Sequence, residues 1–123
     1  MGIHETIVDL AKHPHNFGEL PDADLVIEEG NQSCGDVIKI FLKINDGAIT
    51  DVRFKGLGCA VSLAATSLLT DYIKNKTVDE AKTVTKELLL KLLGTEISAG
   101  RLRCALLPLE ALKKLWLKKL ELC

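Results

Sequence analysis

Three of the four cysteines in this chain of 123 residues lie where a turn meets a regular element. Cys34 stands just before a strand-like run, whereas Cys59 and Cys104 each follow a glycine-containing segment and open a helix-like run. A thiol at the start of a helix faces unpaired N–H groups and the positive end of the helix dipole, both of which favour the thiolate. Thiolate is the form that attacks electrophiles and binds soft metals. These positions therefore indicate metal binding or thiol chemistry.

The cysteines and histidines can also be read as residues without a role in chemistry. A single free cysteine is more often an inert buried residue than a ligand, and the wide spacing of these three matches no paired-cysteine zinc motif. Cys123 ends the chain after a lysine-rich run, and we expect no ligand role for it. His4, His13 and His15 have no partner at metal-site spacing, so we expect them to be structural or solvated.

Apolar alternation predicts the strands that must carry these residues. In the run 37–44, Ile38, Ile40, Leu42 and Ile44 share one face and the two lysines lie on the other. Asp46-Gly47, which follows, is typical of a two-residue hairpin turn. Residues 49–55 would form the return strand, and residues 25–29 a shorter strand before the hairpin. The pattern predicts an antiparallel sheet of about three strands with one face exposed to water.

Helical periodicity accounts for most of the rest of the chain. Thr77 and Glu80 form a capping box, Gly94 is placed to end a helix, and Pro108 is expected in the first turn of the last helix. We expect residues 95–103 to form a loop. The predicted helices span residues 3–12, 60–74, a short segment after Thr77, 86–93 and Cys104 to about Leu120.

Strands grouped before helices predict an α+β fold, with several helices, including a long C-terminal one, packed on one side of the sheet. Residues 1–123 fit one domain, with residues 1–20 as an N-terminal segment that is free to move. A net charge of −1 argues against nucleic acid, and 47% hydrophobic residues exclude disorder. The sequence contains no membrane-spanning run and no secretory signal, so we expect a cytoplasmic, reducing location.

Five runs of residues resemble, in the same order, segments of one known protein family. They are HPHNFG (13–18), NQSCGDVIKI (31–40), DVRFKGLGCAVS (51–62), KNKTVDEA (74–81) and RLRCALL (101–107). The second run is similar to the CGD motif of the IscU/NifU-like iron–sulfur cluster assembly scaffold family, and the third and fifth are similar to its other two cysteine segments. The resemblance covers nearly the whole chain.

This resemblance implies a site and a function. The implied ligands of a 2Fe–2S cluster are Cys34, Cys59 and Cys104, with Asp36 as a weaker fourth ligand whose hard oxygen makes the cluster transferable. A cysteine desulfurase would deliver sulfur as a persulfide, to Cys104. Iron and electron donors would complete the cluster, and acceptor apoproteins would receive it. The protein would then be a scaffold and carrier and not an enzyme.

Three departures from the family pattern modify these expectations. Arg103 stands where the family commonly has histidine, and because guanidinium stays protonated it cannot bind a metal. Arg103 would instead modulate Cys104 or Asp36. Residues 97–102 replace the family's LPPVK segment, so we do not expect the dedicated Hsp70-type chaperone as a partner. Cys123 matches no family ligand.

The alternative function is a zinc-bound sulfurtransferase partner of a cysteine desulfurase, because the same four ligands suit tetrahedral zinc. Zinc or iron could occupy the site when no cluster is present. Whether a cluster lies within one chain or is bridged in a homodimer stays open.

Overall fold

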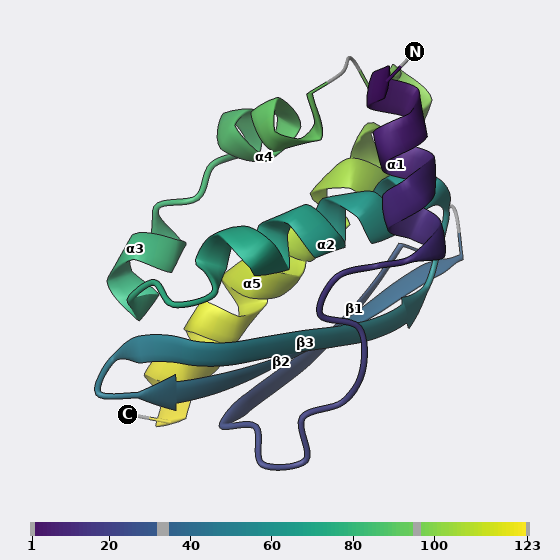
Figure 1. The fold of residues 1–123 in the computed structure, drawn as a ribbon. Coiled ribbons are helices and arrows are strands. Elements are labelled where there is room, and N and C mark those ends of the chain that lie inside the picture. Colours follow the sequence, from purple (N-terminus) through teal and green to yellow (C-terminus); the bar gives the residue numbers. More distant parts are fainter. Residues whose placement is uncertain (1, 32–34, 95–96, 123) are drawn as a thin grey trace.

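The computed structural model describes residues 2–31, 35–94 and 97–122 (Figure 1). Three strands form one antiparallel sheet in the order β1-β2-β3. They are β1 (Leu25–Asn31), β2 (Asp36–Asn45) and β3 (Ala48–Leu57). The α+β fold with a three-stranded antiparallel sheet is as predicted, and each strand is slightly longer than its alternating run.

The β2–β3 hairpin is closed by the predicted two-residue turn. Asp46 and Gly47 both have positive φ values, of 53° and 77°, as such a turn requires. Ile38 and Ile40 of β2 lie opposite Gly56 and Phe54 of β3. In this register the start of β2 lies beside the end of β3. The segments that contain the cysteines adjoin the sheet at this end.

The helices cover one face of the sheet (Figure 1). Helices α2 and α5 pack on the strands, α1 packs on α2, and α4 contacts both α2 and α5. The two ends of the chain lie at opposite ends of the molecule. The helices are α1 (Gly2–Lys12), α2 (Ala60–Ile73), α3 (Val78–Lys82), α4 (Lys86–Leu93), the short 3-10 helix η1 (Ala99–Arg101) and α5 (Leu102–Leu122).

The core lies between the sheet and helices α2 and α5. Ile38, Ile40 and Leu42 of β2 are fully buried, as are Val52 and Phe54 of β3, as the alternation predicts. Helix α2 is buried on several sides, and its buried residues include four with hydroxyl groups. Three of these hydroxyls donate to backbone carbonyls of the helix or its cap, so they do not disrupt the core.

The beginning of α5 differs from the prediction. We expected a loop to Arg103 and Pro108 in the first helical turn, but α5 already begins at Leu102 and η1 precedes it. Pro108 therefore lies inside the helix, in its second turn. Because proline has no N–H, it cannot donate to the carbonyl of Cys104 four residues earlier. The thiol of Cys104 thus projects from a first turn that is less firmly bonded to the turn that follows it.

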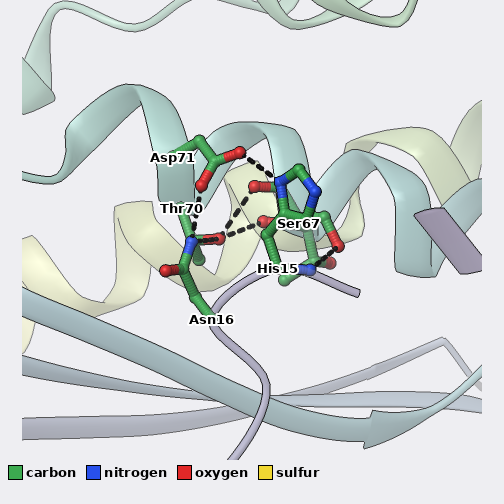
Figure 2. Close-up of polar contacts among 6 residues, drawn as sticks. His15, Asn16, Ser67, Thr70 and Asp71 are labelled. Carbon is green, nitrogen blue, oxygen red and sulfur yellow. Dashed lines mark hydrogen bonds and ion pairs between the residues drawn. The ribbon is translucent and has the colours of Figure 1, made fainter. Parts of the chain in front are cut away.

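A short stretch of the N-terminal segment joins α2 to the free edge of β3 (Figure 2). The ring of His15 lies 2.6 Å from the Asp71 carboxylate, and the side-chain amide of Asn16 donates to Thr70 Oγ1 and Asp71 Oδ1. The backbone of Asn16 and Gly18 bonds Phe54, at 2.9 and 2.8 Å. His15 is structural, as expected. The mobility of residues 1–20 stays a prediction.

Candidate metal centre

Three segments meet at the end of the molecule where β3 ends and α2 begins (Figure 1). Asp36 is the first residue of β2, Cys59 is the residue before α2, and Cys104 is the third residue of α5. One ligand atom from each, a carboxyl oxygen or a sulfur, lies within 4.8 Å of the others. Within the described ranges these three form the only such group of ligand-type side chains. Residues that are far apart in the sequence are thus brought to one point.

Burial distinguishes the two described thiols. Cys104 has no exposed surface and Asp36 is only 3% exposed, whereas Cys59 is partly exposed. A reagent or partner protein therefore meets Cys59 first, and the other two side chains lie behind it.

The Asp36 carboxyl group is only half satisfied. Its Oδ1 accepts the backbone N–H of Cys59 at 3.3 Å. Its Oδ2 is buried and has no hydrogen-bond partner in the described part of the chain. A buried polar atom without a partner costs about 1–3 kcal/mol, so native proteins rarely retain one without a reason. An oxygen and two sulfurs around one point form a donor set that suits a thiophilic cation.

The local environment makes Cys59 more acidic than a free cysteine. Desolvation acts to raise the pKa of its thiol and the charge of Asp36 acts in the same direction. Interactions with the backbone N–H of Ser62, the Cys104 thiol and the Ser62 hydroxyl favour the thiolate and outweigh them, so the pKa lies below its ordinary value. The position before the first turn of α2 therefore has the effect that the sequence predicted.

Gly58 allows this close packing. A Cβ atom at Gly58 would overlap the Ser62 hydroxyl and lie 3.3 Å from Cγ of Asp36. The glycine before Cys59 is thus required by space and not by backbone conformation. It lets β2 and the start of α2 approach closely enough for Asp36 to bond Cys59.

Replacing Gly58 with alanine should separate Asp36 from Cys59. We expect Gly58→Ala to lower the free energy of unfolding by about 1–3 kcal/mol, the usual effect of overpacking, and to weaken zinc binding. Gly100→Ala is the matched control, because a Cβ at Gly100 meets nothing within 4 Å. Urea unfolding and zinc titration measure both effects. Equal zinc affinity in the two variants would contradict this role for Gly58.

The remaining predicted residues have different outcomes. Cys34 and Cys123 lie outside the described residues. Arg103 is exposed on α5 beside Cys104. His13 is also exposed, and His15 bonds Asp71 far from the thiols along α2.

Sequence reasoning missed one residue at the centre, Ser62. Its hydroxyl lies 3.9 Å from the Cys59 sulfur and 3.0 Å from the Cys59 carbonyl oxygen. A hydroxyl residue three positions after a cysteine that precedes a helix was the available signal, since that spacing spans one helical turn.

Known proteins resemble this chain over nearly its whole length. Residues 3–118 match the family described as the NifU-like N terminal domain. The chain belongs to this family. An iron–sulfur cluster assembly scaffold protein IscU of Archaeoglobus fulgidus is 34% identical over 110 residues, which are 89% of this chain and 71% of that protein. The IscU scaffold protein of Escherichia coli strain K12 is 33% identical over 117 residues, 92% of this chain and 90% of that protein.

Solved structures of similar proteins share the fold of this chain. A Fervidobacterium islandicum AW-1 protein, assigned as an iron–sulfur cluster assembly scaffold for the SUF system, aligns with a TM-score of 0.79. It is 28% identical, and the alignment covers 90% of this chain and 93% of that one. The N-terminal part of a NifU-like protein from Brucella abortus has the same fold, with a TM-score of 0.77 at 22% identity, over 95% of this chain and 93% of its own.

Proposed function

We propose that this protein is a scaffold on which an iron–sulfur cluster of the 2Fe–2S type is assembled and from which it passes to acceptor apoproteins. The observation that carries the proposal is the buried meeting of Asp36, Cys59 and Cys104, with one carboxyl oxygen that has no hydrogen-bond partner among the described residues. The family and the names of the curated relatives support it. In this role the cluster is cargo, and the protein is a carrier and not a turnover enzyme.

Each ligand has its own part in this proposal. Cys34, Cys59 and Cys104 supply thiolates, which iron–sulfur clusters prefer. Asp36 supplies an oxygen, a harder ligand that binds such a cluster less tightly. Arg103 modulates the thiolate of its neighbour Cys104. The mixed ligand set therefore holds the cluster but leaves one position from which an acceptor can begin to take it.

Sulfur arrives as a persulfide on a cysteine desulfurase. The Cys104 thiolate attacks the outer sulfur, a new S–S bond forms on Cys104, and the desulfurase cysteine leaves as a thiolate. Nothing is reduced in this transfer. Reduction to sulfide needs electrons from a separate donor, and iron comes from a further partner. Because Cys104 is buried, the desulfurase must approach past the partly exposed Cys59.

An apolar surface on the outer face of the sheet, at the same end as the site, is suited to receive the desulfurase. Val37 and Leu57, which are opposite each other in the sheet, are 38% and 79% exposed. They line a hollow of about 380 Å³ together with Phe17, Lys39 and Lys55. Val37 follows Asp36 and Leu57 lies two residues before Cys59, so the hollow and the site share one end of the sheet, although Val37 points to the face opposite the core that holds Asp36. A desulfurase that grips this end of the sheet would contact both residues.

Replacing Leu57 with aspartate should therefore weaken the complex with a cysteine desulfurase. We expect at least a tenfold higher Kd, corresponding to about 1.4 kcal/mol, because a charge would be placed in the apolar contact. Leu117→Asp is the matched control, since Leu117 is 62% exposed on α5. Calorimetric titration of each variant with the desulfurase gives the comparison. Equal Kd values for the two variants would rule out this docking surface.

The second candidate function is a zinc-bound sulfurtransferase partner of the desulfurase. This second function remains a candidate because two or three thiolates and a carboxylate suit the tetrahedral coordination that zinc prefers. Metal analysis decides between the two functions. Protein purified without oxygen should take up iron and sulfide in equal amounts on anaerobic reconstitution if it is a scaffold. Tightly held zinc, no cluster, and a faster desulfurase would instead establish the alternative.

The other partners follow from the same proposal. Acceptor apoproteins receive the cluster, which either one chain or a homodimer holds. We do not propose a dedicated Hsp70-type chaperone, because the segment it would read is absent from residues 97–102. No described helix is both long enough and apolar enough to cross a lipid bilayer. A reducing cytoplasm would keep the thiols available.

A further inference from the structure

Ser62 lies where it can act on the sulfur of Cys59. It is in the first turn of α2 and has no exposed surface. The Cys59 thiol donates to Ser62 Oγ at 3.9 Å, and the Ser62 hydroxyl donates to the Cys59 carbonyl oxygen at 3.0 Å. One hydroxyl is therefore within reach of two acceptors of the same residue, its carbonyl oxygen and its sulfur.

The bond from Ser62 to the Cys59 carbonyl is dispensable. The same carbonyl already accepts the backbone N–H of Leu63 at 3.1 Å, which is the regular bond of the helix. If the Ser62 hydroxyl turns away, the carbonyl still has a partner. The rotation therefore breaks no bond that the fold needs.

The surroundings keep Ser62 in place while its hydroxyl rotates. Its backbone carbonyl accepts the Thr66 hydroxyl at 2.7 Å. On the other side, Gly58 packs so closely that even a methyl group there would overlap the Ser62 oxygen. The helix and Gly58 thus limit how far Ser62 can shift, whereas its hydroxyl hydrogen can turn toward either acceptor.

A metal-bound sulfur has no proton to donate, so its contact with Ser62 reverses direction. The hydroxyl then donates to the sulfur and withdraws electron density from it. Hydrogen bonds to cluster sulfurs tune the reduction potential, and residues beyond the ligands orient the ligands. Given the proposed function, on which this step depends, we propose that Ser62 is a positioning residue that orients the Cys59 sulfur and lowers its electron density whenever Cys59 binds metal.

Cobalt(II) is the probe that tests this inference, because thiolate-to-cobalt charge transfer reports the electron density on sulfur. In anaerobically cobalt-loaded Ser62→Ala, we expect this band to shift to longer wavelength, since a sulfur without the hydrogen bond is a better donor. In the cluster-loaded protein the reduction potential should become more negative. Alanine is smaller than serine and favours helix, so the variant is expected to fold.

Ser67→Ala is the matched control. Ser67 is equally buried in α2, but its hydroxyl oxygen accepts the backbone N–H of His15, away from the thiols. It should leave the cobalt band and the reduction potential at wild-type values. A band that does not change in Ser62→Ala overturns the inference, and so does the same shift in both variants. Failure of the wild-type chain to bind cobalt or cluster would instead overturn the proposed function.

Discussion

Cys104→Ser is expected to lose its cluster. The affinity of the variant for the cluster should be more than about 100-fold lower than that of the wild type, so it should retain little iron and sulfide. Loss of a residue that only orients a ligand already lowers metal affinity about 10–100-fold. Serine supplies a neutral hydroxyl in place of a soft thiolate, and Cys104 is fully buried at the point where the ligand atoms meet. Anaerobic reconstitution followed by iron and sulfide analysis, with the visible absorption spectrum, measures the loss.

Two further variants keep this result interpretable. Cys123→Ser removes the cysteine to which we assign no role, and it should reconstitute fully. Cys104→Ala tests whether a polar group at a buried site, and not the missing ligand, is responsible for the loss. Thermal unfolding of each metal-free variant checks the fold. Full cluster absorbance in either Cys104 variant would refute the assigned ligand set, and loss in Cys123→Ser would show that this set is incomplete.

Asp36→Ala should have the opposite effect on the lifetime of the cluster. In the proposed site, the oxygen of Asp36 is the ligand that water or an acceptor thiolate displaces first, and alanine would replace it with a small apolar surface. We expect cluster loss in air to slow by about tenfold, or about 1.4 kcal/mol in the barrier. The metal-free variant should also be more stable by about 1–3 kcal/mol, because Oδ2 of Asp36 is buried and no described residue bonds it.

The two effects are measured separately. The decay of the visible absorbance in air gives the lifetime, and urea unfolding of the metal-free protein gives the stability. Asp36→Asn keeps an acceptor for the Cys59 N–H but not the carboxylate, so it distinguishes the lost ligand from the lost 3.3 Å hydrogen bond. Faster cluster loss in Asp36→Ala would contradict the role of Asp36 in release.

The local features of this molecule could be predicted from sequence, because each depends on neighbouring residues. The positive φ values at Asp46 and Gly47 follow from the turn they form, and the Thr77–Glu80 capping box is present as predicted. The beginning of α5 was missed because η1 adds a turn whose residues carry no periodic signal. Pro108, which would be acceptable in the first turn of a helix, therefore lies in the second turn of α5.

The site could be predicted only in part. The turns and glycines beside the cysteines marked them as unusual and the family resemblance implied Asp36, but no local pattern states that Cys104 would reach Asp36 and Cys59. That meeting depends on α5 folding back over the sheet, where it packs on β1 and β2. Ser62 was missed although its spacing from Cys59 was visible in the sequence, because only the structure shows how closely Gly58 packs on its hydroxyl.

The bonds between residues 16–18 and Phe54 have a consequence for self-association. β3 is the last strand of its sheet, and an unpaired strand edge can serve as a template for a strand of another molecule. Asn16 and Gly18 occupy the N–H and carbonyl of Phe54, at the centre of the part of β3 that would otherwise be open. The same stretch that binds α2 thus protects the sheet from edge-to-edge aggregation, and a chain lacking it would be prone to form β-rich assemblies.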